Sequence, residues 1–216
     1  MIELANADIG TGLVDAYESL AQLIEGLDDA AWGTPTRCPG WEVRDVAGHV
    51  AGLASDALSG APGSRTADEQ AAEMRDHTPA EIAAQLREAR AAFHSFFELL
   101  DDAAWNAPSG VPDMTLVHGI EALFDDAYVH EDDVRAALGL PANRGPALMG
   151  SVAYLARMLA LKGWGPATLA LDGLPEHDIG AGGRTVTGDP HQFVLVATGR
   201  ADPATLGLDA SVNVYA

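Results

Sequence analysis

The sequence predicts a mainly α-helical protein, in which a four-helix bundle precedes a small α/β domain. One observation is an internal repeat: LDDAAW occurs at residues 27–32 and again at 100–105. Each copy follows an amphipathic segment and precedes a proline-containing turn and a further helical segment, which indicates a helical hairpin used twice. A second observation is the change to short β-like segments after Gly163. We therefore expect domains at 1–163 and 164–216.

The helices of the bundle are predicted from apolar residues that recur every three or four positions. The first is expected at about 5–27, where Leu13, Tyr17, Leu20 and Ile24 form a seam. The second is expected at 41–58, the third begins at Thr78, and the fourth is expected at 115–138. A fifth helical segment is expected at 148–162. Thr78 and Glu81 fit a capping box with Pro79 in the first turn.

Two further regions lack a clear helical period. Residues 59–78 are rich in Gly, Ser and charge and are expected to form a loop. In the C-terminal domain, strands are expected at 167–171, 185–186 and 212–215, with a turn at 180–183. Residues 189–198 fit either a helix or a strand.

Composition narrows the possible partners. The 216 residues are 48% hydrophobic, which is enough for a full core. The formal net charge of −20 argues against binding to nucleic acids or anionic membranes, because both require a basic surface. The acidic surface is expected to keep the protein soluble.

Localisation is expected to be cytoplasmic. Cys38 is the single cysteine, so an internal disulfide is impossible. The N-terminal residues show neither a basic segment nor a long apolar run, so no signal peptide is expected. The longest apolar segments fall short of a membrane span.

Three polar residues stand out on the apolar faces of the predicted helices. Asp126 and His130 lie one turn apart in the fourth helix, where His130 occupies a core position. His49 interrupts the apolar face of the second helix. Small neighbours leave room beside it: Ala47, Gly48, Ala51 and Gly52.

Antiparallel hairpins would bring His49 to Asp126 and His130. Two imidazoles and one carboxylate can bind a divalent metal, and three protein ligands with an open position are typical of a catalytic site. The alternative is structural: a hydrogen-bonded core histidine and an Asp–His ion pair give the same spacing. The spacing alone leaves both interpretations open.

Several segments resemble one known family. CPGWEVRDVAGHVAGL (38–53) is similar to the start of the metal-binding helix of the mycothiol-dependent maleylpyruvate isomerases, which belong to the DinB/YfiT-like bundles. DDAYVHEDDVRAALG (125–139) resembles their second ligand motif. The Trp32, Pro35 and Cys38–Trp41 pattern is also similar, and residues 186–208 resemble their small C-terminal domain.

The resemblance implies a metal held by His49, Asp126 and His130, with water completing the shell. The family's acidic ligand is often Glu, so the shorter Asp126 departs from the pattern. Zn²⁺ is the implied metal, while Ni²⁺, Fe²⁺ and Mn²⁺ remain compatible with these donors. The implied cosubstrate is a low-molecular-weight thiol, mycothiol, whose thiolate attacks an electrophilic small molecule, either in cis–trans isomerisation or in thiol S-transfer.

The family also implies a basic residue that binds the substrate carboxylate. Arg200, in VATGR, is the first candidate and Arg184 the second; a planar guanidinium binds a carboxylate bidentately. A surface arginine without this role is the alternative for both.

The remaining residues with chemical potential receive simpler interpretations. Cys38 is expected to be structural, and Trp41 to pack at the helix entry. Residues 131–133 are expected to form a solvated acidic face, or to supply an acceptor for the free N–H of His130 or His49.

Two other functions stay open. One is a non-catalytic bundle that binds a metal or ligand, and the other is a thiol-independent biosynthetic enzyme that uses the same pocket. The expected oligomeric state is a monomer or a homodimer, and the sequence does not choose between them.

Overall fold

The computed structural model describes residues 4–109 and 114–216 and divides into two compact units. One spans Ala5–Ala142, and the other includes Asn143–Ala216. We expected the boundary after residue 163, at the end of helix α8 (Pro146–Leu161). Instead α8 packs against β2 and α9 of the second unit. An apolar helical period shows that a face is covered, but not which element covers it.

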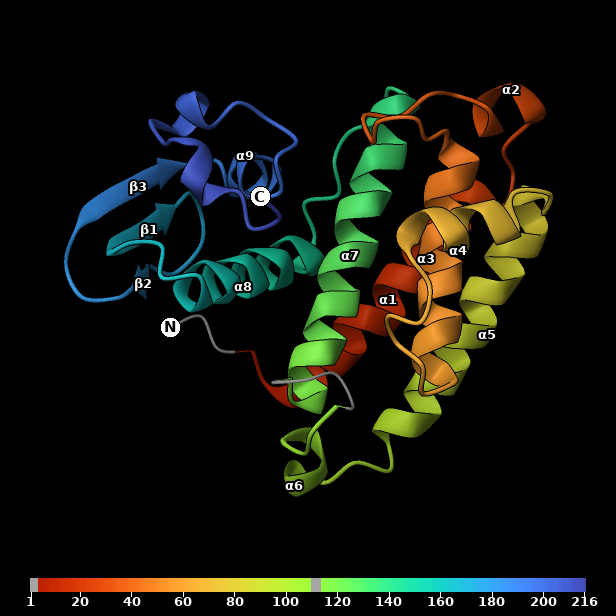
Figure 1. The fold of residues 1–216 in the computed structure, drawn as a ribbon, viewed down its shortest axis with the longest axis horizontal. Helices are drawn as coiled ribbons and strands as arrows, with labels where there is room; N and C mark the ends of the chain where they lie inside the picture. The colour runs from red at the N-terminus through yellow and green to blue at the C-terminus, as the bar shows by residue number, and fades with distance from the viewer. Residues whose placement is uncertain (1–3, 110–113) are drawn as a thin grey trace. The chain divides into compact units, whose positions relative to one another are not determined.

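The first unit is the predicted helical bundle (Figure 1). Its long helices are α1 (Asn6–Ile24), α3 (Val43–Leu58), α5 (Pro79–Phe97) and α7 (Leu116–Ala137). Helices α1 and α3 each pack against both α5 and α7, so the four helices enclose one core. Each helix buries an apolar stripe, which is the main source of stability for helices in water.

The LDDAAW repeat forms the same structure twice. Each copy is a single helical turn, α2 (Asp29–Trp32) or α6 (Asp102–Trp105), and each ends in a buried tryptophan. The preceding aspartate caps each turn by accepting a backbone N–H. A β-bridge from the following proline then leads into the next long helix: Pro35 to Glu42, and Pro108 to Thr115. The repeated unit and its four long helices are confirmed. The hairpin packing is not, because α1 packs mainly on α5 and α7 rather than on α3.

The loop expected at 59–78 contains a helix, α4 (Ala67–Met74). Thr66 and Glu69 form a capping box at its start. The sequence ADEQAAEM has Met74 as its only large apolar residue, so hydrophobic periodicity gives little sign of this helix. The expectation of a continuous loop was wrong.

Two glycines of α3 let α4 approach closely. A Cβ atom at Gly48 would lie 2.9 Å from the Cβ of Met74, and one at Gly52 would lie 2.8 Å from the Cβ of Gln70. Real Cβ atoms do not approach other carbons so closely, so larger residues would push the helices apart. The room that the sequence shows beside His49 is therefore occupied by α4.

The second unit contains a small mixed sheet in the order β2-β1-β3. Its strands are β1 (Ala167–Leu171), β2 (His177–Ile179) and β3 (Arg184–Gly188). Strand β2 runs antiparallel to β1, and β3 runs parallel to it. The predicted strand at 167–171 is confirmed, and the one at 185–186 is part of β3.

The last part of the chain is helical. The ambiguous segment 189–198 forms α9 (Pro190–Ala197), capped by Asp189 with Pro190 in its first turn. The strand expected at 212–215 is absent, since a 3₁₀ turn, η2 (Ala210–Val212), ends there; a preceding turn is η1 (Pro203–Leu206). Within the described residues, no helix combines the length and apolarity needed to cross a membrane.

Candidate metal centre

The three predicted ligands meet between α3 and α7. The Nε2 atom of His49 lies 3.4 Å from Oδ1 of Asp126, and the Nε2 atom of His130 lies 3.6 Å from the same oxygen. The three ligand atoms all lie within 4.8 Å of one another. His49 is only 6% exposed, while Asp126 keeps a quarter of its side-chain surface accessible. The site is thus enclosed yet reachable.

The donor set fits a tetrahedral metal ion. Two ligand atoms that are each about 2.0–2.1 Å from zinc lie about 3.4 Å apart in a tetrahedral arrangement. The two distances to Asp126 Oδ1 match this separation. Imidazole nitrogen and carboxylate oxygen are ordinary ligands of zinc and of its divalent neighbours.

His130 is held by its own helix. Its Nδ1 atom donates to Oδ2 of Asp133 over 2.9 Å, which leaves Nε2 free to act as a ligand. Asp133 is fully buried and also accepts a hydrogen bond from Nε of Arg37 over 2.6 Å. Arg37 reaches Asp132 as well. Asp133 therefore takes the supporting role that the sequence analysis left open for residues 131–133.

The acidic run at 131–133 is not a solvated face. All three of its residues are buried, and Glu131 accepts hydrogen bonds from Ser19 and Arg135. Because this run lies on α7, which packs against α1, neighbouring elements supply partners for its charges. The expectation of a solvated face was wrong, because helical spacing alone does not reveal arginines that reach in from elsewhere.

Cys38 belongs to the same cluster. Its Sγ atom donates to Oδ2 of Asp133 over 3.1 Å. Cys38, Asp133 and His130 form a second group whose potential ligand atoms lie within 4.8 Å of one another. In that group Asp133 already accepts a hydrogen bond from Nδ1 of His130. The hydrogen bond from Cys38 to Asp133 connects the loop before α3 to α7, which agrees with the structural role expected for Cys38.

His49 is held by a different helix. Its Nδ1 atom lies 2.8 Å from Oε1 of Gln70, a residue of α4 that is 1% exposed. Gln70 could not be singled out from the sequence because it lies in the segment expected to be a loop. A capping box at Thr66 and Glu69, resembling that recognised at Thr78, was the available signal for a helix there.

Trp41 lies beside both imidazoles. Its ring centroid is 5.3 Å from that of His49 and 6.1 Å from that of His130. The indole Nε1 donates to Oδ1 of Asp68 in α4 over 2.9 Å, which fixes the ring in place. Trp41 is therefore part of the candidate site as well as of the helix entry, a role that the sequence analysis missed.

The electrostatic field of the site favours positive charge. Burial disfavours the protonated form of His49, but the charge of Asp126 and the hydrogen bonds to Asp126 and Gln70 outweigh it, so the pKa of His49 lies above its usual value. Burial raises the pKa of Tyr17, and the nearby charge of Asp126 adds to this effect. A field that favours a proton on His49 also favours a metal cation.

Arg200 follows the end of α9 in the second unit. Gly199 adopts a positive φ of 73° after the helix ends, a conformation that suits glycine. The half-buried Arg200 then donates from Nη1 to the backbone oxygen of Thr198 over 3.4 Å. The Gly-Arg pair of VATGR thus forms a helix terminus.

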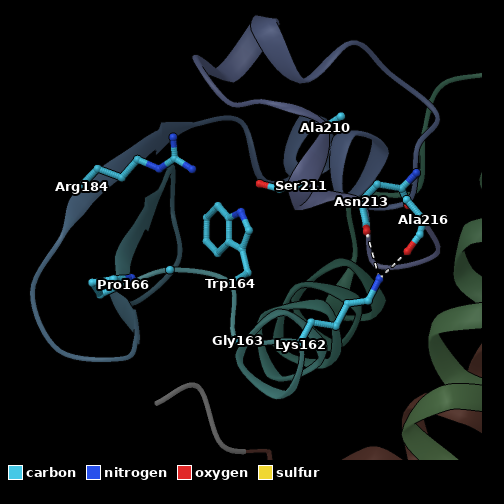
Figure 2. Close-up of a pocket in the computed structure, with 10 residues that line it drawn as sticks. Lys162, Gly163, Trp164, Pro166, Arg184, Ala210, Ser211, Asn213 and Ala216 are labelled. Carbon is cyan, nitrogen blue, oxygen red and sulfur yellow. Dashed lines mark hydrogen bonds between the residues drawn. The ribbon is translucent and has the colours of Figure 1, made fainter.

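Arg184 lies at a cavity of about 570 Å³ in the same unit. Its guanidinium is 5.2 Å from the ring centroid of Trp164, a cation–π contact. Figure 2 shows both side chains and Ser211 around this cavity, with Lys162 bonded to the backbone oxygens of Asn213 and Ala216 on one side. A cation and an aromatic ring facing one cavity can recognise a planar anion.

The fold and this site define a DinB-like helical bundle with a candidate metal centre and a small C-terminal α/β unit. The family model that matches is the mycothiol maleylpyruvate isomerase N-terminal domain, over residues 13–135. Since the match covers more than half of the chain, the protein belongs to the mycothiol maleylpyruvate isomerase family. The matched segment contains all three candidate ligands.

Two solved structures share the fold. The chain is 18% identical to a mycothiol-dependent maleylpyruvate isomerase, with a TM-score of 0.63 and coverage of 92% of this chain and 90% of the other. A second structure, of the isomerase with one histidine mutated to alanine, gives 17% identity, a TM-score of 0.58 and the same coverage. No curated protein matches the chain.

Proposed function

We propose that the protein is a metal-dependent enzyme that uses mycothiol as a nucleophile on a small electrophile, in maleylpyruvate isomerase-like cis–trans isomerisation or in S-transfer. The observation that carries the proposal is the convergence of His49, Asp126 and His130 at distances that suit one metal ion. Family membership supports the choice of thiol and of reaction.

The residues of the chain divide the work. His49, Asp126 and His130 would hold the metal, with Zn²⁺ the first choice and Ni²⁺, Fe²⁺ or Mn²⁺ as other options. A metal bound there would lower the pKa of the thiol and fix its position. Trp41 lies against the two imidazoles and would place an apolar ring beside the bound thiol.

The isomerisation needs a reversible addition. The thiolate adds to one carbon of a double bond conjugated to a carbonyl, and the electron pair moves onto the carbonyl oxygen. The former double bond rotates as a single bond, and return of the electron pair expels the thiolate. In S-transfer the C–S bond is kept, and the returning electron pair instead takes a proton from solvent at the carbon next to the carbonyl. Arg200, or Arg184 as second candidate, would bind the substrate carboxylate.

Metal analysis of the protein purified without added metal tests the site. We expect stoichiometric metal in the wild type and in His94→Ala, which alters an exposed histidine of α5 outside the ligand group and serves as the matched control. His49→Ala and Asp126→Ala are expected to lose the metal. Full metal content in both variants would contradict the proposed site.

Mycothiol titration tests the chemistry separately. We expect a thermal shift on addition of mycothiol, and conversion of maleylpyruvate only when mycothiol is present. Arg200→Ala and Arg184→Ala are then compared: the variant that raises KM with little change in kcat identifies the residue that binds the carboxylate. Absence of binding at millimolar mycothiol would exclude the thiol-dependent function and leave the metal centre intact.

A further inference from the structure

The interaction of Gln70 with His49 is part of a longer chain of polar contacts. The Nε2 atom of Gln70 donates to Oδ2 of Asp56 over 2.8 Å, and both residues are buried. Asp56 also accepts from Nε of Arg65 over 3.0 Å, and Arg65 reaches the backbone oxygen of Gly52 over 3.1 Å. The contacts therefore run from the guanidinium of Arg65 through the carboxylate of Asp56 and the amide of Gln70 to the imidazole of His49.

The charge of Asp56 determines which way the Gln70 amide points. An ionised carboxylate only accepts hydrogen bonds, so the NH₂ group of Gln70 must face it. The carbonyl oxygen of Gln70 is then directed at Nδ1 of His49, and a carbonyl oxygen also only accepts. The hydrogen bond can form only when Nδ1 carries the proton.

Two neighbours compete for the single ring proton of neutral His49. Asp126 favours a proton on Nε2, across 3.4 Å, whereas Gln70 favours one on Nδ1, across 2.8 Å. The shorter distance lies within the usual range for an N–H···O hydrogen bond, and the longer one lies beyond it. A buried Gln70 oxygen left without a donor would also cost about 1–3 kcal/mol. Both arguments favour the proton on Nδ1.

We propose that Gln70, oriented by Asp56 and Arg65, is a positioning residue that holds His49 in the Nδ1–H tautomer and directs the lone pair of Nε2 at Asp126 and His130. Its effect on metal affinity rests on the proposed metal centre, whereas the tautomer itself does not. Gln70 reaches His49 only because Gly52 lets α4 lie against α3.

Long-range ¹H–¹⁵N NMR of the metal-free protein reads the tautomer directly, at a pH where imidazoles are neutral. The signals of His49 are identified by their absence from His49→Ala. We expect wild-type His49 to carry its proton on Nδ1, and Gln70→Met to shift the proton toward Nε2. Gln22→Met alters an exposed glutamine of α1 and serves as the control, with no expected change. A wild-type proton on Nε2 would overturn the proposal.

Asp56→Asn provides a second variant. It keeps the size of the side chain but removes the charge that orients the amide, so we expect a mixed tautomer at His49. This outcome separates orientation from packing, since Gln70 itself is unchanged. An unaltered Nδ1–H tautomer in both Gln70→Met and Asp56→Asn would show that neither residue controls His49.

Zinc affinity, measured by competition with a chromophoric chelator, links the tautomer to the site. Loss of a partner behind a metal ligand typically costs about 10–100-fold in affinity, and we expect this for Gln70→Met but not for Gln22→Met. Equal affinity in the wild type and Gln70→Met would overturn the positioning role while the metal centre stands. If zinc fails to bind the wild type, the metal centre is wrong, and the NMR result still decides the tautomer.

Discussion

The two histidines of the candidate site are supported in different ways. His130 donates to Asp133, three residues further along the same helix. His49 donates to Gln70, which lies on another helix and arrives through the packing of α4 on α3. The first support is local and anionic, whereas the second is tertiary and neutral. The two ligands therefore depend on different kinds of supporting contact.

Two histidine ligands that look equivalent at the candidate site therefore depend on unequal supporting structure. The hydrogen bond between His130 and Asp133 needs only that α7 is helical, because residues i and i+3 lie next to each other on a helix. The support of His49 depends on two glycines, a short helix and a partly buried ion pair between Arg65 and Asp56. Substitutions near His130 on α7 and substitutions near His49 at the α3–α4 contact should therefore weaken the site for different reasons.

The largest effect is expected on the α7 side. Asp133→Ala removes an acceptor shared by Arg37, Cys38 and His130. Breaking a buried charge pair lowers the free energy of unfolding by about 3–5 kcal/mol. We expect the lower end, about 3 kcal/mol, because Arg37 still has its ion pair with Asp132. Urea denaturation measures the loss, with the exposed Glu98→Ala as control. A decrease in unfolding free energy below about 1 kcal/mol would show that the contacts of Asp133 contribute little to stability.

A smaller effect is expected on the α4 side. Gly52→Ala places a Cβ atom 2.8 Å from the Cβ of Gln70, so α4 must move outward. Overpacking of this kind lowers the free energy of unfolding by about 1–3 kcal/mol. Zinc affinity should fall as well, because the hydrogen bond between Gln70 and His49 is lost. Gly26→Ala meets no atom within 4 Å and should be neutral or slightly stabilising. Unchanged stability in Gly52→Ala would contradict the close packing of α4.

The smallest effect concerns acid pH. Burial disfavours ionisation of Asp56, but hydrogen bonds from Arg65 and Gln70 outweigh it, so the pKa of Asp56 lies below its usual value of 3.8. A depressed pKa stabilises the folded state above the unfolded value, and this contribution disappears as the pH falls through the folded value. The stability difference between wild type and Asp56→Asn should therefore shrink below about pH 4. A difference independent of pH would rule out this contribution.

Much of the fold could be predicted because its signals are local. The seam of α1, the capping box of Thr78 and Glu81, and the repeated LDDAAW turns each depend on residues close in sequence, and all three are present. Helix α4 was missed because it is short and polar, and its stability comes from contacts with α3. The strand expected at 212–215 failed because short apolar runs do not distinguish strands from other structure.

By itself, the sequence determined that Asp126 and His130 share one face of a helix, since helical geometry fixes that relation. It also indicated His49 as an anomaly on an apolar face. Only the tertiary structure decided that Asp133 is buried with Arg37, that Trp41 lies beside both imidazoles, and that Gln70 supports His49. These contacts join residues up to 96 positions apart, and no periodicity in the sequence records which distant surfaces will meet.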